Sequence, residues 1–185
     1  EHDNRIDRLE SILPGANCGA CGFAGCTAYA EAVVEGKADV CGCVVGKNAV
    51  AKSAAEIMGV TAAESEEQTA HVFCMGTCEN AKDKFKYIGV DDCVSASKLA
   101  GGAKICSNGC LGLGSCMAVC KFNAVSVKNG IAKIDSDKCT ACGMCVKKCP
   151  KHLISIIPKK SRVFANCSNL EKGAAASKEC LVSCI

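Results

Sequence analysis

The feature that most constrains this chain is a run of four cysteines followed by proline, Cys139-Thr-Ala-Cys142-Gly-Met-Cys145-Val-Lys-Lys-Cys149-Pro150. Its spacing, C-x2-C-x2-C-x3-C-P, is that of the thiolate ligands of 4Fe–4S clusters. In this pattern three close thiolates bind one cluster and the fourth binds a second. Structural zinc sites prefer two well-separated C-x2-C pairs, so the run indicates iron and sulfide rather than zinc.

A second cysteine run precedes the first and departs from its spacing: Cys106-Ser-Asn-Gly-Cys110-Leu-Gly-Leu-Gly-Ser-Cys116-Met-Ala-Val-Cys120. Leu113 occupies the place of the middle thiol between Cys110 and Cys116, so we expect Cys106 to replace it. By pseudo-symmetry, we expect two clusters with four thiols each. The first set is Cys106, Cys110, Cys116 and Cys149, and the second is Cys120, Cys139, Cys142 and Cys145.

The residues between and after these runs are predicted to form short strands. In residues 124–134, apolar and polar residues alternate on both sides of Asn129-Gly130, a typical hairpin turn. Residues 153–157 (LISII) form the matching strand after the second run. A hairpin placed between two cysteine runs is the arrangement of a small two-cluster ferredoxin.

The N-terminal 60 residues carry a separate cysteine group among helical segments. Apolar residues at helical spacing predict a helix over 3–13, and further helices are expected over 27–35 and 47–60, the last with Asn48 or Ser53 as its cap. The thiols are Cys18, Cys21 and Cys26, followed by Cys41 and Cys43, of which only one is needed as a fourth ligand. The polar, acidic residues 61–70 are expected to form a linker.

A third block contains Cys74, Cys78 and Cys93, with Asp91 or Asp92 as the cap of a helix reaching Leu99. It has no fourth cysteine nearby, so it indicates a cluster completed from far along the chain, or else structural thiols or zinc. An internal repeat supplies a candidate, because residues 72–84 resemble 163–173 and Lys104-Ile-Cys106-Ser-Asn-Gly-Cys110 resembles Lys178-Glu-Cys180-Leu-Val-Ser-Cys184. We therefore expect Cys167 to be the fourth ligand and leave Cys180 and Cys184 unassigned.

Composition supports metal-dependent folding. The 185 residues include 19 cysteines, no Trp, five Phe and two Tyr, so metal ligation must supply much of the folding free energy. The odd cysteine count argues against a disulfide framework, and a net charge of +3 is too small to indicate nucleic acid. No run of about 18 apolar residues is present, which would be needed to span a membrane. No catalytic residues and no dinucleotide fingerprint are evident, so NAD is expected to bind elsewhere.

The segment Leu13-Pro-Gly-Ala-Asn-Cys18-Gly-Ala-Cys21-Gly-Phe-Ala-Gly-Cys26 resembles the cluster domain before the ferredoxin domain in the B subunit of the Rnf complex, an ion-translocating ferredoxin:NAD oxidoreductase. Cys43-Val-Val-Gly46 matches that family's fourth-ligand stretch, Cys-Pro-Val/Pro-Gly, better than Cys41 does, although Val44 replaces proline. The extra cysteine block and the variant run of residues 110–116 resemble the cluster-rich members found in anaerobes.

The resemblance implies an electron-transfer subunit that takes electrons from reduced soluble ferredoxin into a membrane-bound, ion-pumping complex at the cytoplasmic face of the cell membrane. It also implies other complex subunits as partners, a membrane helix before residue 1 and further clusters beyond residue 185. The cysteine groups of the chain itself predict three 4Fe–4S clusters and offer ligands for a fourth. Basic residues around the second run are candidates for steering ferredoxin, or form a solvated surface: Lys147, Lys148, Lys151, Lys159, Lys160 and Arg162.

The expected fold class is α+β. A small helical four-cysteine domain (1–60) is followed by a linker and extra cysteine block (61–105), then by a two-cluster ferredoxin-like domain with short β-hairpins (106–162) and the start of a second such unit (163–185). Two other functions compete: an iron–sulfur subunit of another anaerobic redox enzyme, and a redox sensor with structural zinc.

Overall fold

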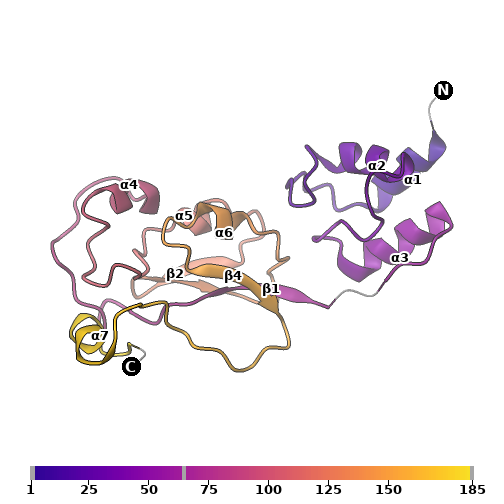
Figure 1. Ribbon diagram of the computed structural model, residues 1–185. Coiled ribbons are helices and arrows are strands. Elements are labelled where there is room, and N and C mark those ends of the chain that lie inside the picture. The colour runs from indigo at the N-terminus through magenta and orange to yellow at the C-terminus, as the bar shows by residue number, and fades with distance from the viewer. Residues whose placement is uncertain (1–2, 64–65, 184–185) are drawn as a thin grey trace. The chain divides into compact units, whose positions relative to one another are not determined.

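The computed structural model describes residues 3–63 and 66–183. The described residues divide into two compact units (Figure 1). One holds residues 3–63 and 66–67 with the short segment 140–142, and the other holds residues 68–139 and 143–183. Each unit has its own apolar core. The fold class is α+β, as expected. No helix in the described part of the chain is both long and apolar enough to cross a bilayer.

The first unit contains three helices, α1 (Asn4–Ile12), α2 (Cys26–Val34) and α3 (Lys47–Met58). Helix α1 packs on both α2 and α3, and the core includes Leu9, Tyr29 and Val33. All three helices lie where the sequence predicted them. The N-cap of α3 is Gly46, however, so the expected caps Asn48 and Ser53 are wrong. Its C-cap is Gly59 at φ 68°, a left-handed conformation that glycine adopts without strain.

The second unit contains two small antiparallel sheets. Strand β1 (Gln68–Val72) pairs with β4 (Ile154–Pro158), and β2 (Val125–Lys128) pairs with β3 (Ile131–Ile134). The β2–β3 turn is Asn129-Gly130, with φ of 50° and 72°, so the predicted hairpin is confirmed. Residues 68–70, which we expected in a linker, begin β1. That segment is largely polar, and its strand exists because β4 provides a paired edge.

Four short helices complete the second unit: α4 (Cys93–Lys98), α5 (Ser115–Ala118), α6 (Met144–Lys148) and α7 (Gly173–Glu179). Helix α5 packs against β2 and α6 against β4, and the two helices contact each other (Figure 1). Both follow a glycine in the left-handed region, Gly114 at φ 78° and Gly143 at φ 75°, so that each helix begins inside a cysteine run. Helix α7 was not predicted.

The core of the second unit is small and rich in sulfur. It contains Cys116, Cys139 and Cys145 beside Leu153, which is only 1% exposed. The thiols that carry the candidate chemistry are therefore also part of the packing.

Candidate iron–sulfur sites

Four thiols of the first unit line one pocket, which we call the N-terminal pocket. Cys18, Cys21, Cys26 and Cys43 lie around about 340 Å³ of space, part of it open to solvent. The loop before α2 is held by Asn17, whose Oδ1 accepts a hydrogen bond from the Cys26 amide at 2.8 Å. Cys41 does not line this pocket, and its thiol donates to the Ala63 carbonyl at 3.7 Å. The geometry thus favours Cys43 over Cys41 as the fourth ligand.

Tyr29 fixes the segment that returns to the N-terminal pocket. Its hydroxyl donates to the Asp39 carbonyl at 2.7 Å, and its ring packs 5.8 Å from that of Phe23 between centroids. Burial raises the pKa of Tyr29 to about 12, with the Cys43 and Cys21 thiols adding to the effect. The hydroxyl therefore stays neutral and keeps its hydrogen bond over the whole physiological range.

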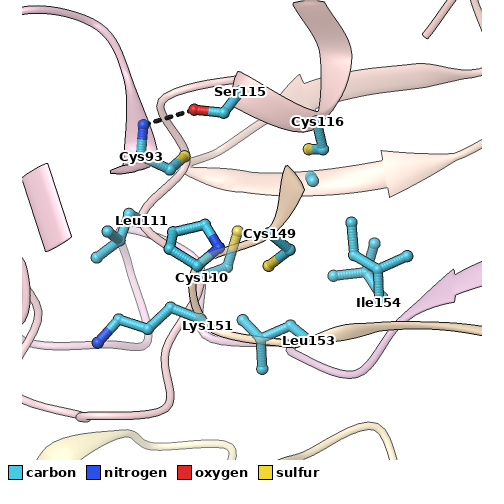
Figure 2. A pocket seen from close by; sticks show the side chains of 12 residues that line it. Cys93, Cys110, Leu111, Ser115, Cys116, Cys149, Lys151, Leu153 and Ile154 are labelled. Atoms are coloured by element: carbon cyan, nitrogen blue, oxygen red, sulfur yellow. Dashed lines mark hydrogen bonds between the residues drawn. The ribbon is translucent and has the colours of Figure 1, made fainter. Parts of the chain in front are cut away.

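A second set of thiols lines the central pocket, which lies within the second unit. Cys93, Cys110, Cys116 and Cys149 surround about 350 Å³ of space among Val72, Leu153 and Ile154. Figure 2 shows the four sulfur atoms around this common space. Burial, first, and then the thiols of Cys110, Cys93 and Cys149 raise the pKa of Cys116 to about 12. Four such thiols can be deprotonated together only if a cationic centre compensates their charge.

Cys93 takes the place in the central pocket that we expected Cys106 to fill. The Cys93 amide donates to Ser115 Oγ at 2.6 Å (Figure 2). Ser115 Oγ in turn donates to Asp92 Oδ1 at 2.7 Å. These bonds fasten the start of α4 to the start of α5, beside Cys116. The structure therefore places Cys93, and not the expected Cys106, beside Cys110, Cys116 and Cys149 around this pocket, through a contact between distant segments. Which four thiols bind the cluster stays a prediction.

Apart from Cys106, the remaining thiols of the ferredoxin runs are Cys120, Cys139, Cys142 and Cys145. Cys139 and Cys145 are buried in the core of the second unit, with Cys120 packed against it. Backbone amides donate to two of these sulfurs, from Ala70 to Cys139 at 3.3 Å and from Ala124 to Cys120 at 3.4 Å. Amide donors of this kind help to set the potential of an iron–sulfur cluster. The four-thiol ligand set stays a prediction.

A third pocket, the repeat pocket, is lined by Cys74, Cys106, Cys167 and Cys180. The expected group of Cys74, Cys78, Cys93 and Cys167 is thus only half present, since Cys93 lies in the central pocket. Cys78 is exposed; its amide donates to the Asn129 carbonyl at 2.9 Å, which places it against the hairpin turn. Cysteine spacing alone did not identify Cys180 as a candidate ligand. The sequence signal that could have done so is the internal repeat, in which Cys180 corresponds to Cys106. Cys184 lies outside the described residues.

The described residues contain no group of three or more His, Cys, Asp or Glu side chains close enough to hold a single metal ion. The thiols instead lie around pockets. The donor set of each pocket, four thiols with mostly apolar or glycine surroundings, fits a 4Fe–4S cluster.

Comparisons with known proteins agree with this chemistry. Residues 13–45 match the family model "Putative Fe-S cluster", and residues 132–155 match the family "4Fe-4S binding domain". Thiol-lined pockets on short helices and two-stranded sheets, together with these matches, define an iron–sulfur protein that carries several 4Fe–4S clusters.

Three similar proteins cover nearly the whole chain. The B subunit of the proton-translocating ferredoxin:NAD(+) oxidoreductase complex of Clostridium ljungdahlii is 46% identical over 97% of this chain and 64% of its own length. The B subunit of the Na(+)-translocating ferredoxin:NAD(+) oxidoreductase complex of Acetobacterium woodii is 43% identical over 98% of this chain and 55% of its own length. The B subunit of the ion-translocating oxidoreductase complex of Methanosarcina acetivorans is 40% identical over 97% of this chain and 69% of its own length.

The chain therefore belongs to the family of B subunits of ion-translocating oxidoreductase complexes, the Rnf family. It spans 64% and 55% of the length of the first two of these relatives.

Proposed function

We propose that this chain is an electron-transfer subunit of a membrane-bound, ion-translocating ferredoxin:NAD oxidoreductase, working at the cytoplasmic face of the cell membrane. The observation that carries the proposal is the convergence of four thiols on each of two apolar pockets in a chain of this family. When bound, a 4Fe–4S cluster takes up and releases one electron at a time. The donor is a reduced soluble ferredoxin, and the acceptors are other subunits of the complex.

Three thiol sets are proposed as cluster ligands. The first is Cys18, Cys21, Cys26 and Cys43; the second is Cys93, Cys110, Cys116 and Cys149; the third is Cys120, Cys139, Cys142 and Cys145. Buried apolar side chains around the central pocket, including Leu153 and Ile154, limit the access of water to its thiols. Exclusion of water and amide donors to sulfur are the means by which a protein adjusts a cluster potential.

The docking surface for ferredoxin is proposed at the end of α6. Lys147 and Lys148 are exposed in its last turn and immediately precede Cys149. Two other basic residues are engaged elsewhere: Lys159 pairs with Asp137 at 3.0 Å, and Lys151 donates to the Ser107 carbonyl at 2.6 Å. Exposed lysines beside a thiol of the central pocket would attract an acidic partner to that pocket.

The test is a charge reversal of this docking surface. Lys147→Glu with Lys148→Glu is expected to slow reduction by reduced ferredoxin about tenfold at low salt, and the difference should shrink as salt screens the charges. Arg8→Glu with Lys52→Glu makes the same change in net charge on exposed residues of α1 and α3 and serves as the control. The measurement is anaerobic stopped-flow bleaching of the visible absorbance. Equal rates for the wild type and the α6 variant would contradict the docking surface.

A further inference from the structure

The repeat pocket is built from two copies of the internal repeat. Cys74 and Cys106 come from the first copy and Cys167 and Cys180 from the second. Two of the sulfurs converge on Gly76, where an added Cβ would lie 3.4 Å from Cys180 Sγ and 3.7 Å from Cys74 Sγ. Neither family model covers this set of four thiols, since the matches span residues 13–45 and 132–155.

Backbone hydrogen bonds bring the two copies together around the segment 80–84. On one side of it, the Ile105 amide donates to the Lys82 carbonyl at 2.9 Å. On the other side, the Leu181 amide donates to the Asn80 carbonyl at 2.9 Å. Cys106 and Cys180 directly adjoin these contacts, and both are only 8% exposed.

Cys167 reaches the same pocket by a separate contact. Its neighbour Ser168 donates from Oγ to the Phe73 carbonyl at 3.1 Å, which places Cys167 beside Cys74. This contact therefore brings a thiol of the second repeat copy to a thiol of the first.

The repeat pocket matches the two pockets described above in size and donor set. Counting the part that is open to solvent in each case, it contains about 340 Å³ of space, against about 350 Å³ for the central pocket and 340 Å³ for the N-terminal pocket. Each pocket is lined by four cysteines and no other ionisable group except Lys151 in the central one and Tyr29 in the N-terminal one.

A buried lysine lies next to the repeat pocket. Lys104 is 5% exposed, and its Nζ donates to the Gly76 carbonyl and, at 3.2 Å, to the Gly130 carbonyl. Gly76 itself lines the pocket. A buried ammonium is costly unless a nearby negative charge compensates it, and backbone carbonyls supply only partial charge.

We propose that Cys74, Cys106, Cys167 and Cys180 hold a further 4Fe–4S cluster, and that the buried ammonium of Lys104 offsets part of its negative charge. This site is additional to the three in the proposed function, and it does not depend on which protein donates the electrons. Because each repeat copy contributes two ligands, the cluster also joins the segment 163–183 to the ferredoxin-like part of the second unit.

The decisive variant is Cys180→Ala, because Cys180 lies outside both ferredoxin runs. After anaerobic reconstitution of the whole chain, it should lose about four iron and four sulfide per chain relative to the wild type, while the EPR signals of the other sites remain. Cys106→Ala should lose the same amount. Cys78→Ala and Cys41→Ala, at cysteines outside all three pockets, should keep the full content.

Full iron content in Cys180→Ala would overturn the proposal. So would a loss that extends to the other sites, because Cys180 would then support the fold and not one cluster.

Lys104→Met tests the electrostatic role of the buried ammonium. An EPR-monitored redox titration should show one midpoint potential shifted to a lower value and the others unchanged, a change that a purely structural role of Lys104 would not produce. Unchanged potentials throughout would contradict the role given to Lys104. Iron, sulfide and EPR need neither ferredoxin nor NAD, so a failure here is distinct from a failure of the proposed function.

Discussion

At the scale of single residues, two glycines allow the variant cysteine run to pack against the hairpin. Gly112 has φ 70°, and a Cβ there would lie 2.6 Å from the carbonyl carbon of Gly130. A Cβ on Gly130, at φ 72°, would meet the sulfur of Cys78. Glycine is therefore required at position 112 of the Leu-Gly-Leu-Gly stretch for two reasons: the positive φ, and the lack of space for a Cβ beside the hairpin.

This packing predicts unequal effects of alanine at two glycines of similar φ. At Gly143 the φ is 75° and nothing lies within 4 Å of an added Cβ. Gly143→Ala should therefore lower the free energy of unfolding by about 1 kcal/mol, through left-handed backbone strain alone. Gly112→Ala adds a clash with the Gly130 backbone and should lower the free energy of unfolding by about 2–4 kcal/mol in total. The midpoint of thermal loss of the visible absorbance measures both variants. Equal midpoints would show that the loop and the hairpin are not in contact.

At the scale of elements, α4 positions one thiol of the central pocket, because its first residue is Cys93. Asp92 is its N-cap, and its carboxylate accepts from the Ser95 amide at 2.8 Å as well as from Ser115. Hydrogen bonds from Ser115, first, and then from Ser95 lower the pKa of Asp92 to about 2. Its contribution to stability is therefore present above its ordinary pKa of 3.8 and is lost as the pH falls towards 2.

Removal of this cap should affect both the helix and the pocket. Asp92→Ala should lower the thermal midpoint by a few degrees, and Asp92→Asn by less, because asparagine also caps helices. The Ala variant should also lose iron from the central pocket more readily under a mild chelator, since Cys93 is no longer fastened to α5. Asp91→Ala, one residue earlier, is the matched control. If it behaved like Asp92→Ala, the specific hydrogen bonds would not be responsible.

At the scale of the whole molecule, the chain has too little apolar interior to be stable without its thiol sites. Leu153 is the only large side chain in the described residues that is less than 2% exposed. The core of the second unit is formed in part by cysteines, and the core of the first by alanines, two leucines, a valine and one tyrosine. Metal-bound cysteines must therefore contribute a large share of the folding free energy.

Removal of iron and sulfide by a chelator in the presence of a reductant should consequently unfold most of the chain. The expected result is a loss of more than half of the far-UV circular dichroism and rapid proteolysis, both reversed on anaerobic reconstitution. Iron-free protein that keeps its full circular dichroism would contradict the view that the clusters hold the fold together.

The sequence by itself determined the local features of this protein. Cysteine spacing indicated iron–sulfur chemistry, and Asn129-Gly130 predicted the hairpin. Helical spacing of apolar residues predicted α1, while helix-forming residues and end signals predicted α2 and α3. Each of these signals depends on residues near one another in the chain. The choice of Cys43 and the expected ligand set of residues 120–145 stay predictions.

Only the tertiary structure decided which distant thiols share a pocket. Cys93 reaches Cys116 through Ser115, and Cys180 reaches Cys74 through the segment 80–84. Strand β1 likewise forms on the edge of β4, although its own residues barely favour a strand. The physical reason is the same in each case: these contacts join segments far apart in sequence, and their hydrogen-bonding and packing energies are not encoded in local spacing.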